Sequence, residues 1–176
     1  ISNLLKNVSF WMDQNYSLSN GNELVLYLNS SVGDGIQANN PWLQEMPDPI
    51  SRVCWDNYLS ISSKLANELN LQIGDMTTQK LLLKLDSGKE YLIPAIVQPG
   101  QAEGTVGLAL GYGRKKSGVV GNNVGQDAYE MIEFLKGYQN LTIKNIQLSN
   151  SNEEYRIAQT QTHHTIMGRE SVIQET

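Results

Sequence analysis

Turns rich in glycine, proline and aspartate divide the sequence into short runs of strand-forming residues, and this pattern limits what the chain can form. The clearest unit is a hairpin in which residues 80–85 and 90–97 flank the turn Asp86-Ser87-Gly88-Lys89. Further strands are predicted at 23–29, 53–61, 105–110, 141–148 and 154–160. Strands at such short intervals predict a mainly β fold in the form of a closed barrel.

Helical signals are few. Ser62 or Ser63 is a predicted N-cap, because a hydroxyl can accept a hydrogen bond from an amide of the first turn. Apolar residues at 65, 66 and 69 follow at helical spacing. Asn70 is expected to end this short helix in a left-handed conformation. Prolines at 41, 47 and 49 predict an extended segment, and residues 129–135 fit either one helical turn or the start of a strand.

Length and charge restrict the possible partners. A chain of 176 residues is expected to form about one domain. Its formal net charge of −5 argues against a nucleic-acid surface, because phosphate binding needs clustered Lys and Arg. The short cluster Arg114-Lys115-Lys116 is interpreted as a solvated loop. On the basis of this charge we expect no nucleic-acid partner. No run approaches the length of a transmembrane helix, so we also expect no direct membrane insertion of this chain.

No motif in the chain carries catalytic chemistry by itself. Gly111-Tyr112-Gly113 begins like a dinucleotide fingerprint but lacks the third glycine. Adjacent residues of a strand point to opposite faces, so His163 and His164 cannot readily bind one metal. Cys54 is the only cysteine, which excludes an internal disulfide and a cysteine-based iron–sulfur site in this chain. We interpret Cys54 as a buried thiol, and we predict no catalytic residue and no metal ligand.

Two polar loops have the composition of a ligand-binding surface. The residues that supply side-chain amides are Asn39, Asn40, Asn122 and Asn123. Glycines between 111 and 125 would allow a ligand to approach the backbone closely. The alternative is that all of these are ordinary turn residues. The aromatic residues Trp42, Trp55 and Tyr58 also allow two interpretations, which are packing in the core or between domains and stacking on a flat heterocycle.

Several segments, taken in order, resemble one known family. Asn40-Pro41-Trp42-Leu43-Gln44-Glu45 is followed by a proline-rich step, a capped helix, and Leu71-Gln72-Ile73-Gly74-Asp75. This order resembles the C-terminal, pterin-dinucleotide-binding domain of molybdopterin oxidoreductases related to dimethyl sulfoxide reductase. Gln98-Pro99-Gly100-Gln101-Ala102-Glu103-Gly104-Thr105-Val106 and Gln161-Thr162-His163-His164 are similar to one branch, the large iron–sulfur and molybdopterin-like subunit of alternative complex III. The resemblance extends from residue 36 to residue 170.

The resemblance implies a six-stranded double-psi β-barrel with short helices and added strands. It implies that the loops at 40–43 and 112–125 face the nucleotide and pterin of molybdopterin guanine dinucleotide. The cofactor-binding residues predicted in this way are Asn40, Trp42, Leu43, Tyr112, Gly113, Asn122, Asn123 and Gly125. Such a domain supplies only one wall of a site, so we expect no catalysis by it in isolation. Iron–sulfur clusters would lie in other parts of the parent protein.

Two hypotheses about function follow from the resemblance. In the first, the barrel is a structural scaffold with a vestigial pocket, in a quinol-oxidising complex whose electrons pass through iron–sulfur clusters. Its partners would then be other domains of the same polypeptide and partner subunits of a membrane complex. In the second, it is the functional dinucleotide-binding domain of an active molybdoenzyme. The similarity to the alternative complex III branch favours the first, and it implies an exported parent that is membrane-associated on the periplasmic side.

The chain is also expected to be a fragment of a longer polypeptide, since it begins at Ile1 and ends at Thr176. Residues 1–20 differ in character from the rest and are assigned to a preceding domain. Residues 21–160 are predicted to form the barrel. Residues 161–176 are predicted to connect the barrel to a following domain.

Overall fold

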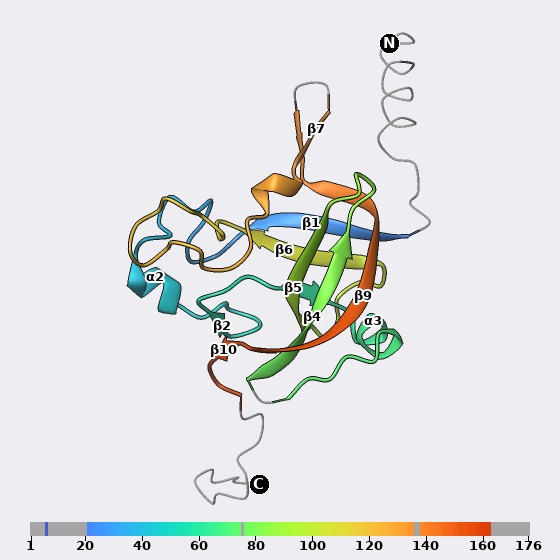
Figure 1. Ribbon diagram of the computed structural model, residues 1–176, viewed down its shortest axis with the longest axis horizontal. Helices are drawn as coiled ribbons and strands as arrows, with labels where there is room; N and C mark the ends of the chain where they lie inside the picture. Colours follow the sequence, from blue (N-terminus) through green and yellow to red (C-terminus); the bar gives the residue numbers. More distant parts are fainter. Residues whose placement is uncertain (1–5, 7–20, 75, 136–137, 163–176) are drawn as a thin grey trace, which may run out of the picture.

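Six strands form a closed barrel in the computed structural model, which describes residues 6, 21–74, 76–135 and 138–162 (Figure 1). In chain order they are β1 (Asn22–Leu28), β3 (Leu59–Ile61), β4 (Thr77–Lys84), β5 (Glu90–Val97), β6 (Thr105–Leu110) and β9 (Thr142–Arg156). Around the barrel the order is β1-β6-β3-β5-β4-β9. The predicted mainly β fold and closed barrel are therefore confirmed.

The strand order contains a repeat that is not visible in the sequence. β1 pairs in parallel with β6, and β3 pairs in parallel with β5, whereas every other pair in the barrel is antiparallel. Exchanging β1 with β5, β3 with β6, and β4 with β9 leaves all of these neighbour relations unchanged. Two interlocked halves of three strands each therefore build the barrel, which is the arrangement of a double-psi barrel.

Alternating side chains fill the barrel. Leu24 and Leu26 of β1 and Leu81 and Leu83 of β4 are almost completely buried, while their neighbours along each strand are more exposed. This period of two is what a half-buried strand requires. β6 differs because five consecutive residues, from Val106 to Leu110, are buried. β6 is therefore covered on both of its faces.

Two of the predicted strand boundaries are wrong. The predicted strand 53–61 is divided into β2 (Val53–Cys54) and β3, because Trp55 has φ 61° and its amide donates to the carbonyl of Gln44 at 3.0 Å. β2 leaves the barrel and pairs with β10 (Ala158–Gln159). The predicted strands 141–148 and 154–160 show the opposite error. Most of their residues belong to one strand, β9, because β4 pairs with residues on both sides of the predicted gap.

The helix after Ser62 forms as predicted. The hydroxyl of Ser62 accepts from the amide of Leu65 at 3.2 Å, α3 spans Ser63–Glu68, and Asn70 has φ 51°. The predicted extended segment at 41–49 is wrong at its start, where α2 spans Pro41–Glu45. Proline is tolerated at the first position of a helix, whose amide has no intrahelical acceptor. The side chain of Asn40 caps this helix.

The segment 129–135 contains both of the structures that its sequence allowed. A 3-10 turn, η1 (Tyr129–Met131), is followed by β7 (Glu133–Leu135). β7 pairs with β8 (Tyr138–Asn140) in a small hairpin that projects from one end of the barrel (Figure 1). Two predicted segments lie almost entirely outside the described residues. Of the segment 1–20, predicted to precede the barrel, only residue 6 is described, and of the predicted connector 161–176 only residues 161 and 162 are described.

Candidate functional site

The two predicted ligand loops lie side by side and form one lobe beside the barrel (Figure 1). We call residues 29–45 and 111–127 the loop lobe. The side-chain oxygen of Asn39 accepts from the amides of Val120 at 3.0 Å and Gly121 at 3.4 Å, which ties the two loops together. The structure therefore brings together segments that are about eighty residues apart in the sequence, as the prediction of a joint surface requires.

The glycines of the loop lobe approach other parts of the protein. A Cβ atom built on Gly111 would lie 2.8 Å from the carbonyl oxygen of Gly33. A Cβ atom on Gly113 would collide with the amide nitrogen of Asp127. Cβ atoms built on glycines 118, 121 and 125 would likewise lie too close to Asn39, Ala38 and Asn57, respectively. The close approach that the glycines permit is thus already occupied by the chain itself.

Asparagines of the lobe also form internal hydrogen bonds, Asn40 and Asn122 through their side-chain oxygens and Asn123 through its backbone. Asn40 accepts from the amide of Trp42 at 3.0 Å as the cap of α2. Asn122 accepts from the amides of Ser117 at 2.7 Å and Gly118 at 3.2 Å. Asn123 takes a left-handed conformation, φ 58°, and its amide donates to the carbonyl of Arg114 at 2.8 Å. These are the bonds of turn and cap residues.

The three apolar and aromatic residues of the predicted site differ in exposure. Trp42 is 81% exposed, Leu43 is half-buried, and Tyr112 is buried. Burial raises the pKa of Tyr112 to about 12, although a hydrogen bond with Ser31 lowers it slightly. Trp42 is available to a ligand or a partner, whereas Tyr112 belongs to the interior of the lobe. Of the other two aromatic residues of interest, Tyr58 is buried and Trp55 is half-buried.

Two buried polar atoms in the loop lobe have no hydrogen-bond partner within the described part of the chain, Gln44 Oε1 and Ser117 Oγ. The other amide atom of Gln44, Nε2, donates to the carbonyl of Ala38 at 2.8 Å. Gln44 is only 1% exposed, so a ligand could not reach its free oxygen without moving the loop. Molybdopterin guanine dinucleotide therefore does not fit the predicted residues as they are arranged, because their backbone amides, the side-chain oxygens of Asn40 and Asn122, and their glycines contact the protein.

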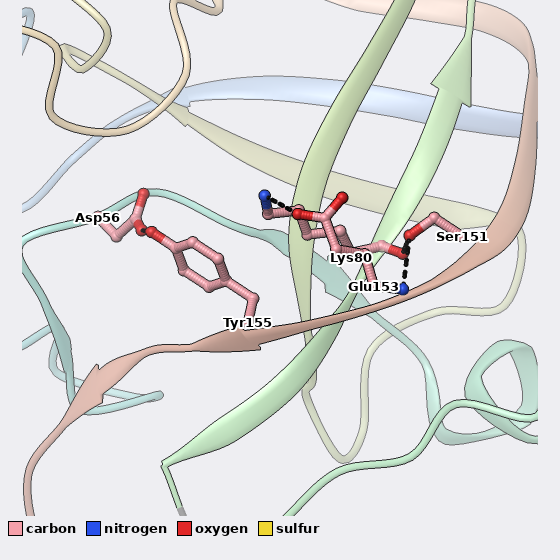
Figure 2. Close-up of polar contacts among 5 residues, drawn as sticks. All are labelled: Asp56, Lys80, Ser151, Glu153 and Tyr155. Carbon is pink, nitrogen blue, oxygen red and sulfur yellow. Dashed lines mark hydrogen bonds and ion pairs between the residues drawn. The ribbon is translucent and has the colours of Figure 1, made fainter.

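A second polar cluster was not predicted from the sequence. The hydroxyl of Tyr155, at the end of β9, donates to the carboxylate of Asp56, which lies between β2 and β3 (Figure 2). Burial raises the pKa of Asp56 to about 6, against smaller lowering effects from Tyr155, from the amide of Asn57 and from Lys80. Burial and the carboxylate both raise the pKa of Tyr155.

Lys80 of β4 extends this cluster to further residues of β9. Its ammonium group lies 5.1 Å from the centre of the Tyr155 ring and 2.5 Å from Glu153 Oε1 (Figure 2). Ser151 donates to the carbonyl of Lys80 at 2.6 Å and accepts from the amide of Glu153 at 3.2 Å. The cluster fastens the end of β9 to β4 and to the segment after β2. No sequence signal could have found it, because the partners Asp56 and Tyr155 are distant along the chain.

A chain of hydroxyl groups lies near the same end of the barrel. Ser51 Oγ is 2.5 Å from the hydroxyl of Tyr58 and 3.1 Å from Asp48 Oδ1. Burial raises the pKa of Tyr58 and of Tyr27, which are hydrogen-bonded neighbours. Asp48 Oδ1 also accepts from the amides of Ile50 and Ser51, so it acts as a turn residue, as its position between two prolines suggests.

A cleft of about 400 Å³ lies away from the loop lobe. It is bounded by residues 50–52 next to β2, by the end of β5 and its following turn, and by residues 159–162. None of the eight predicted cofactor-binding residues lines it. This cleft is therefore not where the resemblance places a cofactor.

The remaining predictions concern metals, membranes and cysteine. No group of three or more metal-ligating side chains occurs among the described residues, and His163 and His164 lie outside them. No described helix is long and apolar enough to span a bilayer. Cys54 is a buried free thiol, as predicted, and burial raises its pKa.

No protein-family model matches this chain. No curated protein matches its sequence either.

Proposed function

We propose that this chain is a scaffold domain of an oxidoreductase subunit, which holds other parts of its parent in place and binds no cofactor of its own. The observation that carries the proposal is the closed loop lobe. Backbone amides of the lobe, which could otherwise bind a dinucleotide, donate to asparagine side chains of the protein. The glycines of the lobe are in close contact with the protein as well. A cradle that is already filled by backbone supports a structural role over a binding role.

The resemblance then gives the scaffold its setting. The parent is an exported, membrane-associated subunit on the periplasmic side, in a complex that oxidises quinol. Electron transfer runs through iron–sulfur clusters elsewhere in the parent, because Cys54 is the only cysteine here and is buried in β2, opposite β10. The partners of the barrel are the other domains of its polypeptide and the neighbouring subunits.

One observation favours the alternative, a functional binding domain for molybdopterin guanine dinucleotide. Trp42 is 81% exposed at the first turn of α2, two residues after the cap Asn40. An exposed indole beside a polar loop is suited to stacking on a flat heterocycle. An exposed indole is equally suited to a protein interface, so Trp42 does not outweigh the filled cradle.

The test is a cofactor analysis of the full-length parent, purified from its membrane. Molybdenum, tungsten and iron are measured by mass spectrometry, sulfide by a chemical assay, and oxidised pterin by fluorescence after denaturation. The scaffold role predicts iron and sulfide without molybdenum, tungsten or pterin. Stoichiometric metal and pterin would refute it and establish the alternative.

A second test uses the chain itself. Guanosine monophosphate and diphosphate are titrated while the fluorescence of the exposed Trp42 is followed, with Trp42→Phe as the control that removes this signal. The scaffold role predicts no saturable change. A saturable change that Trp42→Phe abolishes would show that the loop lobe binds nucleotide after all.

A further inference from the structure

The cleft beside the β2–β10 pair has an apolar floor. Ile96 and Val97 of β5 form one side, and Ile50, Ile73 and Pro99 contribute further apolar surface. Ile96 also belongs to a buried cluster with Val53, Tyr58 and Ile157, which joins β2 and the residue before β10 to the barrel. The floor is therefore fixed by the fold.

Two isoleucines leave apolar surface exposed at this cleft. Ile50 is 69% exposed and Ile73 is 46% exposed. Large apolar side chains gathered at one hollow are typical of a binding site. The volume of about 400 Å³ lies in the range of small-molecule pockets.

One cation stands at the cleft. The exposed residue Arg52 lines the cleft. The ion pairs among the described residues are all formed by lysines, so the guanidinium of Arg52 has no carboxylate partner in the described part of the chain. Arginine is the side chain best suited to bind a carboxylate, because its donors match both oxygens. Polar groups of Ser51, Gln98 and Gln159 also line the cleft.

The backbone holds Arg52 at this place in an unusual conformation. Its φ of 65° lies in the left-handed region, which is uncommon for residues other than glycine and asparagine. Its amide donates to the carbonyl of Asp48 at 3.0 Å, and its carbonyl accepts from the amide of Thr160 at 3.0 Å. Gln159 Nε2 donates to the carbonyl of Ser51 at 2.6 Å. Both flanks of the turn are thus fixed.

We infer that this cleft is a binding site for a small carboxylate with an apolar body, with Arg52 binding the carboxylate and the isoleucine-lined floor binding the apolar part. An apolar hollow with one unpaired cation selects ligands that carry a single negative charge next to a hydrocarbon. The inference does not depend on the scaffold role, because it concerns neither the loop lobe nor a pterin.

The test uses the 176-residue chain and three probes. Octanoate has both parts of the proposed ligand, 1-octanol has the same chain without the charge, and acetate has the charge without the chain. Affinities are measured by calorimetry, and the site is mapped by changes in the amide NMR signals of Gly74, Val97 and Gln159. We expect octanoate to bind at these amides, 1-octanol to bind more weakly, and acetate not to saturate.

Two variants separate the contributions of charge and apolar surface. Arg52→Gln is expected to weaken octanoate binding about tenfold and to leave 1-octanol unchanged, because it removes one charged hydrogen-bonding group. Ile73→Trp, which fills the cleft from an exposed position, is expected to weaken both probes. Arg114→Gln, a change of the same kind in the loop lobe, is the matched control and should leave both affinities unchanged.

Several results would overturn the inference. One is an octanoate affinity that Arg52→Gln does not change while the variant keeps the melting temperature of the parent. Another is signal changes confined to residues outside the cleft. A third is the absence of octanoate binding together with binding of an acidic, leucine-containing peptide at Gly74 and Val97, which would assign the cleft to a protein partner.

Discussion

The carboxyl group of Asp56 should make the stability of this protein fall as the pH rises from 4 to 7. Its pKa in the folded protein is about 6, compared with 3.8 in an unstructured chain. Between these values the folded state keeps a proton that the unfolded state has lost. Folding is therefore favoured at the acidic end of this range, and the contribution is lost as the pH passes through 6.

The magnitude follows from the size of the shift. A difference of roughly two pKa units corresponds to about 3 kcal/mol of free energy of unfolding. Asp56 is only 9% exposed, so solvent screens little of this effect. In Asp56→Asn the group no longer titrates, and the variant should gain about 3 kcal/mol relative to the parent protein between pH 4 and pH 7.5.

The assay is urea denaturation followed by tryptophan fluorescence at several pH values, for the parent and Asp56→Asn in parallel. Taking the difference between the two proteins removes the effects of the other titrating groups. Glu133→Gln, in the exposed β7–β8 hairpin, is the control for the removal of one carboxyl. The difference in free energy of unfolding between Glu133→Gln and the parent should not increase with pH in the way expected for Asp56→Asn.

Tyr155→Phe gives an independent check of the cause. The hydrogen bond from Tyr155 lowers the pKa of Asp56, so its removal should raise that pKa further, which a carboxyl-carbon NMR titration of Asp56 would show. A stability difference between Asp56→Asn and the parent that stays constant from pH 4 to pH 7.5 would refute the reasoning. So would a difference that moves in the opposite direction.

Three further changes test the packing of the barrel and the loop lobe, each by urea denaturation. Gly113→Ala should lower the free energy of unfolding by more than about 3 kcal/mol, because the added Cβ would collide with the amide of Asp127. The control Gly88→Ala, at a similar φ but in open space, should lower it by about 1 kcal/mol. Equal losses for the two variants would contradict the argument from close approach. Asn57→Ala should cost about 3 kcal/mol, because it removes buried bonds to Ala109 and Gln126, and faster hydrogen exchange at the amide of Gln126 should accompany it. Ser62→Ala should cost about 1 kcal/mol through loss of the cap on α3, and an unchanged stability would mean that the cap contributes nothing.

Part of the candidate site follows from composition, but its internal state does not. Glycines and asparagines in two loops are enough to predict that backbone comes close to something at 111–125. They do not say whether the close partner is a ligand or another loop. That distinction depends on where residues 33–39 lie relative to 111–121, which is a long-range property of the fold.

The amino-acid sequence alone specifies the local units of this protein. It determined the 80–97 hairpin, the cap at Ser62, the left-handed end at Asn70 and the barrel class, because these depend on turn chemistry and on a side-chain period within a few residues. Long-range contacts explain why Trp55 interrupts a strand, why β9 is continuous, and why Tyr155 reaches Asp56. These outcomes depend on partners supplied by other strands, and an isolated stretch of sequence carries no record of which partner it will meet.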